Sequence, residues 1–365
     1  MADHAAYMRE CLDLARRGTG RVSPNPRVGA LLVRNGKVVA RGYHRRFGGP
    51  HAEVECLRRY RGPMGGTTLY VNLEPCAHAG KTPPCTDLIV RRGIRAVVVG
   101  MPDPNPLVGG RGIRALRGAG LRVTVGVLRD ECAALNRDFI THVTRRRPYV
   151  HVKVAQTIDG RIGRQDAGFR WITSPPSRAR VHRWRAQYDA VLVGARTIRE
   201  DDPRLSVRYA RGRDPHAVVL DGALSINPRA RVFRSGKDRI VLVCTTPAAV
   251  RRSEARVRRL VKAGATLLVL PGKKGRIALP ELLRALYDQG VGSLFVEGGA
   301  EVFAQFLAEG LVDELSVFVA PAFAGSGVPA LGSSAGPFRV THLRLEMPER
   351  IGDDLLIRAL RPVHA

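Results

Sequence analysis

The chain has 365 residues, of which 44% are hydrophobic and 25% charged, and its formal net charge is +28. This composition excludes a disordered or fibrous protein, and the length suits two globular domains. No apolar run approaches the roughly 20 residues of a membrane span and the start does not have the order of a signal peptide, so we expect a cytoplasmic protein with no membrane partner. Arginines in almost every segment, rather than one cluster, carry the charge, so we expect a phosphorylated small substrate and no nucleic-acid partner.

The first half of the chain is predicted to alternate strands and helices. Asn35-Gly36 lies between two apolar runs, which is the strongest short signal for a β-hairpin, here over residues 29–44. Helical spacing or strand alternation of apolar residues predicts the other elements. These are helices at 7–17, 51–60, 86–92, 111–119 and 130–137, and strands at 67–73, 96–100 and 122–127.

The second half repeats this rhythm after a basic boundary at 145–148. We expect strands at 149–156, 190–193, 217–220, 240–244, 266–270, 293–296 and 315–320, and helices at 177–186, 279–289 and 300–309. Strands that alternate with helices indicate an α/β protein with largely parallel sheets. We therefore predict two α/β domains, residues 1–147 and 148–365.

Two of the six scattered cysteines belong to a pattern with a histidine and a glutamate. Cysteines in a reducing compartment rarely form a disulfide framework, so those with a special spacing are candidates for metal binding. His51-Ala-Glu53 begins a predicted helix, and Pro75-Cys76 and then Cys85 follow a predicted strand. This order is typical of zinc deaminases, in which three protein ligands leave a fourth position for water. We predict His51, Cys76 and Cys85 as zinc ligands and Glu53 as the catalytic acid and base.

The spacing of the two cysteines departs from the usual deaminase pattern. Eight residues, 77–84, separate Cys76 from Cys85, whereas the signature has two. This segment has to loop out and return, and it contains His78, a competing candidate for a metal ligand. Two other functions stay open on the residues alone. One is a deaminase of bases in tRNA or another nucleic acid with a basic accessory domain, and the other is a structural zinc module that binds RNA and uses a fourth protein ligand.

The string Pro75-Cys-Ala-His-Ala-Gly-Lys-Thr-Pro-Pro-Cys85, with Pro24-Asn25-Pro26 upstream, resembles the deaminase half of bifunctional riboflavin biosynthesis proteins. The second half of the chain is similar to their reductase half, so the likeness covers nearly the whole sequence. It implies a cytidine deaminase-like domain followed by a dihydrofolate reductase-like domain, with Asn25 as a substrate contact. The implied reactions are zinc-dependent deamination of 2,5-diamino-6-ribosylamino-pyrimidinone 5′-phosphate and NADPH-dependent reduction of its ribosyl group to ribityl. We also expect a homo-oligomer.

The reductase motifs begin in the first strand of the second half. Lys153-Val-Ala-Gln156-Thr-Ile-Asp159-Gly is similar to the family's K-x-A-x-S-x-D-G, with threonine in place of the serine. Hydride transfer needs a group that balances charge beside the reacting carbon, and Lys153 is our candidate for this catalytic role. A structural ion pair is the alternative. Phe169 stands two residues before Trp171, where the family has a serine that contacts substrate.

Further motifs of the family follow between residues 171 and 303. They are W-I-T at 171–173, R-A at 185–186, D-A-x-x-x-G-x-x-T at 189–197, D-D-P-x-L-x-x-R at 201–208 and E-G-G at 297–299. The resemblance implies that NADPH is bound by Gln156, Trp171, Thr197, Asp201, Gly299, Ala300, Glu301, Val302 and Phe303. It implies that substrate is bound by Arg185, Leu205, Arg208 and Glu297, with Arg208 on the phosphate.

The glycine pair of the E-G-G motif has a physical interpretation of its own. It lies between a predicted strand and a predicted helix, where unhindered backbone amides and the helix N-terminus can hold an anionic group. The sequence lacks a G-x-G-x-x-G after a strand with an acidic residue further on. A Rossmann dehydrogenase is therefore disfavoured.

Overall fold

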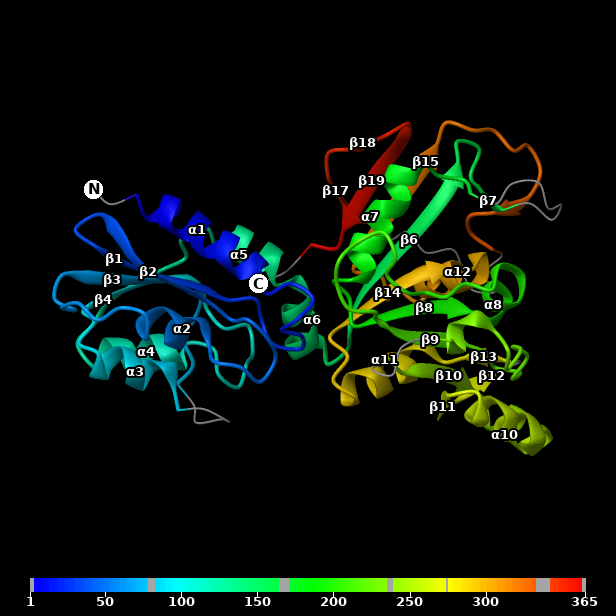
Figure 1. Ribbon diagram of the computed structural model, residues 1–365, viewed down its shortest axis with the longest axis horizontal. Helices are drawn as coiled ribbons and strands as arrows, with labels where there is room; N and C mark the ends of the chain where they lie inside the picture. The colour runs from blue at the N-terminus through cyan, green and yellow to red at the C-terminus, as the bar shows by residue number, and fades with distance from the viewer. Residues whose placement is uncertain are drawn as a thin grey trace. The chain divides into compact units, whose positions relative to one another are not determined.

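In the computed structural model, the chain divides into two compact units, Met1–Arg147 and Pro148–Pro362. The structure describes residues 3–77, 83–163, 171–234, 239–273, 275–332 and 342–362. His78 and Phe169, which the sequence analysis singled out, lie outside these ranges. None of the helices within the ranges combines the length and the hydropathy of a transmembrane segment. Each unit has its own sheet (Figure 1). Each also has its own hydrophobic cores.

The sheet of the first unit has five strands among the described residues, in the order β2-β1-β3-β4-β5. These are β1 (Gly29–Arg34), β2 (Lys37–Tyr43), β3 (Thr67–Leu73), β4 (Ala96–Met101) and β5 (Arg122–Val125). Strand β1 is antiparallel to both β2 and β3, while β3, β4 and β5 are parallel. Asn35 and Gly36 both have positive φ, 48° and 72°, which is the backbone of the predicted two-residue hairpin turn. The hairpin prediction is confirmed.

Helices cover both faces of this sheet (Figure 1). They are α1 (His4–Arg16), α2 (Ala52–Leu57), α3 (Cys85–Arg91), α4 (Arg111–Gly118), α5 (Arg129–Leu135) and α6 (Arg137–Arg145). Residues of α1, α5 and α6 form one core with Leu31, Tyr70 and Val98. Residues of α2, α3 and α4 form the other core on the opposite face, so the unit has three layers.

The helix predicted at 130–137 is present as α5, but it ends at Leu135, and α6, which was not predicted, follows it. The side chain of Asn136, between the two helices, is fully buried. It accepts a hydrogen bond from the backbone N–H of Arg27 at 2.8 Å and donates one to the backbone carbonyl of the same residue at 3.0 Å. A side chain that serves a distant backbone in this way breaks a helix that local propensity alone would continue.

The main sheet of the second unit has the order β11-β10-β9-β8-β14-β6-β15-β19-β17 in the part of the chain that the structure describes, and β18 also pairs with β19. The strands of this sheet are β6 (Tyr149–Thr157), β8 (Ala190–Gly194), β9 (His216–Leu220), β10 (Val241–Thr245), β11 (Ala265–Val269), β14 (Ser293–Gly298), β15 (Glu314–Ala320), β17 (Arg344–Leu345), β18 (Glu349–Ile351) and β19 (Asp354–Leu360). From β11 to β15 the sheet is parallel, as expected, and β19 is antiparallel to β15. Two small pairs lie apart from it, β7 (Arg161–Gly163) with β16 (Val328–Pro329) and β12 (Gly272–Lys273) with β13 (Arg276–Ile277).

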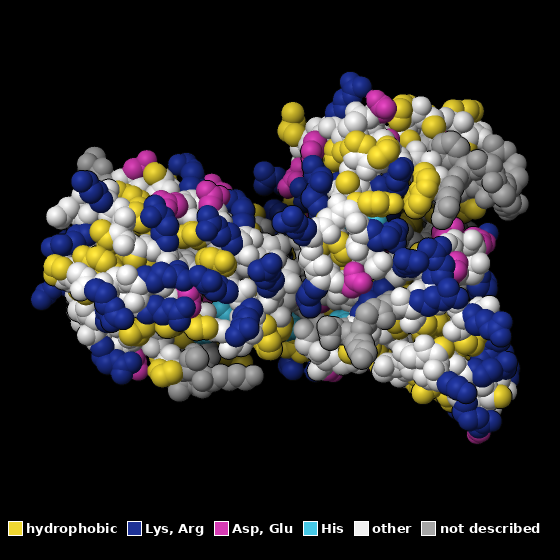
Figure 2. Space-filling model, in the orientation of Figure 1, with side chains coloured by type: hydrophobic (Ala, Val, Ile, Leu, Met, Phe, Trp, Pro, Cys, Tyr) yellow, Lys and Arg dark blue, Asp and Glu magenta, His cyan; other side chains and the backbone are white. Residues whose placement is uncertain are grey.

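Helices again lie on both faces of this sheet (Figure 1). They are α7 (Pro175–Arg185), α8 (Ala195–Asp201), α9 (Pro247–Arg252), α10 (Glu254–Lys262), α11 (Leu279–Asp288) and α12 (Ala300–Ala308), with a 3-10 turn η1 at Arg231–Phe233. Helices α11 and α12 contribute to one core and α7 to α10 to the other. Figure 2 shows Lys and Arg side chains spread over the visible face of each unit, between hydrophobic and other polar side chains.

Strand β6 carries polar side chains into the second of these cores. Val150, Val152 and Val154 belong to the core that contains α11 and α12. Because side chains alternate along a strand, Tyr149, His151 and Lys153 face the other side, under α7. The His151 ring is buried and hydrogen-bonds Ser316 and Tyr188, each at 2.8 Å.

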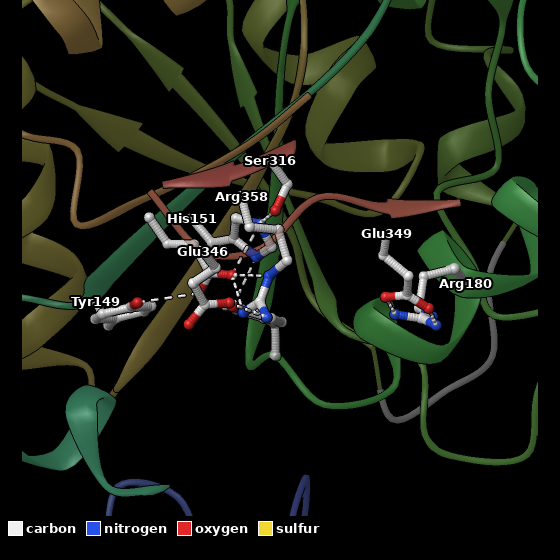
Figure 3. Close-up of polar contacts among 9 residues, drawn as sticks. Tyr149, His151, Arg180, Ser316, Glu346, Glu349 and Arg358 are labelled. Carbon is white, nitrogen blue, oxygen red and sulfur yellow. Dashed lines mark hydrogen bonds and ion pairs between the residues drawn. The ribbon is translucent and has the colours of Figure 1, made fainter. Parts of the chain in front are cut away.

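A second set of contacts joins Tyr149 and Arg358, both labelled in Figure 3, through the carboxylate of Glu314. Glu314 accepts hydrogen bonds from Tyr149 at 3.0 Å and from Arg358 at 2.6 Å, and Arg358 also binds Glu346 at 2.7 Å. Burial lowers the pKa of His151 to about 4. The network therefore holds a neutral imidazole beside the buried carboxylate of a partly buried ion pair, and its polar groups are partnered as burial requires.

Candidate functional sites

The three predicted metal ligands come together in the first unit. The His51 Nδ1 and the Sγ atoms of Cys76 and Cys85 all lie within 4.8 Å of one another. His51 Nδ1 is 3.3 Å from the sulfur of Cys85 and 3.6 Å from that of Cys76. A tetrahedral zinc ion with bonds of roughly 2.1 Å to nitrogen and 2.3 Å to sulfur needs ligand atoms about 3.6 Å apart. The donor set therefore fits zinc in both chemistry and spacing.

Local structure explains why these side chains converge. His51 is the residue before α2, Cys85 is the first residue of α3, and Cys76 follows the carboxyl end of β3. The backbone N–H of Cys85 points at the Cys76 sulfur from 3.3 Å. Helix N-termini favour negative charge, so the start of α3 stabilises the thiolate of Cys76. Gly42 lets α2 pack directly on β2, because a Cβ there would lie 2.3 Å from the backbone nitrogen of Cys56.

Protonation of the three groups is coupled. The hydrogen bond with Cys85 lowers the pKa of Cys76 to about 4, with a further contribution from His51 and against the effect of burial. The same bond, together with burial, raises the pKa of Cys85, and the bond with Cys76 raises that of His51. The three side chains thus share protons through these hydrogen bonds, and the negative charge lies on the Cys76 thiolate. A divalent cation takes the place of such protons when a site of this kind is loaded.

Glu53 lies on the first turn of α2, two residues after His51. Its side chain is only 3% exposed. Burial raises the pKa of this carboxyl, and the neighbouring His51 partly offsets that effect. The structure thus has a buried carboxyl beside the three ligands, where a proton acceptor for an attacking water has to lie.

His44 is a residue of this site that the sequence analysis missed. Its Nε2 lies 3.2 Å from the Nδ2 of Asn25, the predicted substrate contact, and its Nδ1 lies 2.9 Å from the carbonyl of Pro50. Since a carbonyl can only accept, Nδ1 carries the proton and Nε2 accepts from Asn25. The ring also contacts that of His51, with centroids 5.8 Å apart. The sequence offered only a histidine just after a strand, which is no specific signal.

Glu74 was missed as well. It follows β3 and comes two residues before Cys76. Its carboxylate accepts hydrogen bonds from the backbone N–H groups of Asp103 and Gly110, both at 2.9 Å, and of Ile113 at 3.1 Å. It therefore ties the loop after β4 and the start of α4 to the strand end that carries Cys76. Its three partners are 29, 36 and 39 residues away, so no local pattern pointed to this role.

In the second unit, Lys153, Glu297 and Arg185 form a buried charged triad. Arg185 binds both carboxylate oxygens of Glu297, one of them at 2.7 Å, and the Lys153 Nζ lies 3.8 Å from Glu297. Burial alone would raise the pKa of Glu297, but Arg185 and Lys153 outweigh it, so this pKa lies below its ordinary value. Burial lowers the pKa of Lys153, and Glu297 opposes that shift. The motif residues of three separate segments thus meet on one face of the sheet.

The predicted substrate residues of the D-D-P-x-L-x-x-R motif follow α8. Leu205 is buried at a positive φ of 54°, and Arg208 is exposed with its guanidinium 5.7 Å from the ring centroid of Tyr209. Asp201 ends α8, and burial raises its pKa. Asp202 serves the fold, since its carboxylate accepts from the backbone N–H of Arg231 at 2.7 Å.

The E-G-G motif ends β14 and begins α12, as expected. Gly299 has φ 95° and precedes the helix, and a Cβ on Gly298 would lie 3.2 Å from the hydroxyl of Thr197. The two glycines therefore bring backbone close to Thr197, another predicted cofactor residue. Of the predicted segment 299–303, Val302 and Phe303 bury their side chains in the core, so a cofactor at this turn has their backbone, not their side chains, to contact.

A hollow lies at the carboxyl end of β6. It is lined by Thr157, Arg161, Gly163, Ile172, Ala322, Phe323 and Ala324. Asp159 shapes its rim, since its carboxylate accepts from the backbone N–H groups of Ala324 at 3.1 Å and Gly325 at 2.8 Å. Gln156, half-buried, immediately precedes the lining residue Thr157, while Trp171 is 50% exposed with Arg178 5.0 Å from its ring centroid. A hollow with a mainly apolar lining suits the apolar part of a small-molecule ligand, and Trp171 immediately precedes its lining residue Ile172.

Both units match known protein families. Residues 1–101 match the cytidine and deoxycytidylate deaminase zinc-binding region, and residues 148–357 match the RibD C-terminal domain. The predicted fold class, a deaminase-like domain followed by a reductase domain, is confirmed.

Relatives match over almost the full length. The riboflavin biosynthesis protein RibD of Aquifex aeolicus is 39% identical over 358 residues, which are 96% of each chain. A crystal structure of a diaminohydroxyphosphoribosylaminopyrimidine deaminase/5-amino-6-(5-phosphoribosylamino)uracil reductase from Thermotoga maritima is 36% identical, with a TM-score of 0.84 over 98% of this chain and 99% of that one. Acinetobacter baumannii RibD is 32% identical with a TM-score of 0.86, over the same shares of the two chains.

Proposed function

The chain belongs to the RibD family of bifunctional riboflavin biosynthesis enzymes, and on that premise we propose which residues carry its two reactions. The deaminase reaction takes place at His51, Glu53, Cys76 and Cys85 in the first unit. The reductase reaction takes place around Lys153 in the second unit, with NADPH as reductant. The observation that carries the proposal is the convergence of one nitrogen and two sulfur ligands within 4.8 Å of one another, next to the buried Glu53.

The substrate of the deaminase is the diaminopyrimidine ribosylamine 5′-phosphate that the name of the Thermotoga relative describes. A zinc ion held by the three ligands supplies the activation of water at neutral pH. Glu53 accepts the proton of the attacking water and delivers it to the ring nitrogen and then to the leaving amino group. A carbon–oxygen bond forms, the carbon–nitrogen bond breaks and ammonia leaves. Asn25, held by His44, orients the pyrimidine ring beside Glu53.

Reduction of a ribosyl to a ribityl group adds a hydride to the sugar carbon and a proton to the sugar oxygen. NADPH supplies the hydride, and its proposed contacts are the hollow beside β6, Trp171, Asp201 and the turn from Gly299 into α12. Lys153 supplies positive charge and a proton at the sugar, and its nearly buried position keeps water from competing. Glu297 holds Lys153 and contacts the substrate, and Arg208 binds the phosphate with its exposed guanidinium.

Two variants test the assignment of the two reactions to the two units. We expect Glu53→Gln to lower ammonia release at least about 100-fold, the contribution of a general acid and base, while zinc content and NADPH oxidation with the deaminated substrate are unchanged. We expect Lys153→Met to abolish NADPH oxidation and to leave ammonia release intact. Loss of both activities in either variant contradicts the separation. Loss of zinc in Glu53→Gln points to a structural role for this carboxylate.

A homo-oligomeric state and a cytoplasmic location stay predictions. The expectation that nucleic acid is not a partner also stays a prediction. The alternative function is the deamination of bases in a nucleic acid. NADPH and RNA discriminate between these functions. A rise in melting temperature with NADPH but not with RNA supports the reductase assignment, and the reverse supports the alternative.

A further inference from the structure

Residues 204–208, which we call the strap, connect α8 toward β9 without helix or strand structure. Each of its five residues has a backbone group bonded to a side chain from elsewhere in the unit. Three backbone carbonyls accept from arginines: Arg239 donates to Arg204 at 2.7 Å and to Leu205 at 3.2 Å, and Arg185 donates to Ser206 at 3.1 Å. Two backbone N–H groups donate to side chains. That of Val207 donates to Asp214 at 2.7 Å, and that of Arg208 donates to His182 at 3.0 Å.

This pattern fixes a segment that has no regular structure of its own. Irregular backbone loses conformational entropy when it is ordered, and buried side-chain bonds offset that loss. Arg239, Arg185 and His182 are all buried. The strap ends at Arg208, whose side chain is exposed. The five bonds therefore fix the backbone that carries the exposed guanidinium of Arg208, which lies over the ring of Tyr209.

His182 is the last of these partners and the one in contact with Arg208. It lies three residues before Arg185 on α7, so the two side chains share a helix face. A backbone N–H can only donate, so the ring accepts at Nδ1 and carries its proton on Nε2. The ring also packs edge-on against Tyr209, with centroids 4.7 Å apart. Burial, with the nearby cations Arg185 and Arg208, lowers the pKa of His182 to about 4, so the acceptor is available at neutral pH.

We infer that His182 is a positioning residue for the reductase reaction, holding the backbone of Arg208 so that its guanidinium meets the phosphate of the substrate. The inference rests on the role of Arg208 in the proposed function. A flexible Arg208 would have to be ordered each time substrate binds, and the entropy of that ordering would be subtracted from the binding energy. The affinity for the phosphorylated substrate should therefore depend on a residue that does not touch it.

The test compares the full-length protein with His182→Ala, His182→Asn and Arg208→Ala, each assayed for NADPH oxidation with the phosphorylated substrate and with its dephosphorylated form. We expect His182→Ala to raise KM for the phosphorylated substrate about 10-fold, the effect of one lost hydrogen bond to an ordered group. KM for NADPH and for the dephosphorylated substrate should change less than about twofold. Asparagine places an amide oxygen where Nδ1 lies, so His182→Asn should restore most of the affinity.

The outcomes separate the inference from the function on which it rests. If Arg208→Ala does not affect the preference for phosphate, the proposed phosphate contact fails and the inference fails with it. If Arg208→Ala removes the preference for the phosphorylated substrate and His182→Ala does not, only the positioning role of His182 is overturned. An equal effect of His182→Ala on both substrates also overturns it, because a general structural defect would act in that way. If His182→Ala does not fold, His182→Gln replaces it, since its amide mimics Nε2, and equal KM values for the Asn and Gln variants overturn the inference.

Discussion

Removing the charge of Glu297 should destabilise the second unit strongly. The Glu297→Gln variant leaves Arg185 and Lys153, whose side chains are 11% and 13% exposed, without their shared carboxylate. Breaking a buried ion pair from one side costs about 3–5 kcal/mol, because the remaining charge is desolvated and unpaired. Since 1 kcal/mol moves the melting temperature of a domain of this size by about 2–4 °C, we expect a drop of about 6–20 °C.

Differential scanning calorimetry of the full-length protein measures this drop, and the transition of the first unit serves as an internal reference. The matched control is Glu349→Gln, which breaks a two-bond pair with Arg180, at 2.7 and 3.1 Å, on the surface of the same unit (Figure 3). Side chains 27% and 49% exposed make a pair of that kind worth about 1 kcal/mol or less. A Glu297→Gln variant that melts within about 2 °C of the control would refute the argument that burial makes the triad costly to break.

Other variants test the remaining features. We expect Cys85→Ala to lose zinc as measured by metal analysis, whereas Cys244→Ala, a buried cysteine of the other unit, retains it; equal zinc content in the two would sink the ligand assignment. Glu74→Ala should lower the stability of the first unit by about 2–4 kcal/mol, because three backbone donors lose a charged acceptor, and a shift below about 0.5 kcal/mol in urea unfolding would contradict this. The pKa of His151 in the folded protein, about 4, lies below its ordinary value of 6.5. Between these two pH values only the unfolded chain binds the proton. The free energy of unfolding should therefore fall by about 3 kcal/mol as the pH drops from 6.5 to 4. His151→Leu should show a shallower pH dependence in that window, and an unchanged slope would show that the ring does not titrate in this way.

The metal cluster and the strands around it were largely predictable from the sequence. The hairpin at Asn35-Gly36 follows from the backbone preferences of two adjacent residues, and β3 from apolar residues that alternate over seven positions. His51, Glu53 and the cysteines could be named because their residue types and order carry the chemistry. The ligand atoms meet because β3 ends where α2 and α3 begin, which the spacing suggested but did not require.

The supports of both sites escaped prediction. Asn136 separates α5 from the unpredicted α6 because it bonds to Arg27, 109 residues away, and His182 holds Arg208, 26 residues further along the chain. Helices α9 and α10 are short and rich in arginine, so their apolar spacing is weak, and they are ordered by packing Ala249 and Leu260 into the core. Strand β19 was missed too, and it is ordered by its antiparallel pairing with β15.

By itself, the order of residues determined the α/β class, the hairpin, the alternation of strands and helices and the identity of the groups that can bind zinc, because each depends on neighbours within a few positions. Only the tertiary structure decided which backbone each buried polar side chain serves. Glu74, Glu297, Asn136 and His182 all bond to partners from distant segments. A buried charge or amide has to find a partner wherever the fold places one, and no local pattern specifies where that is.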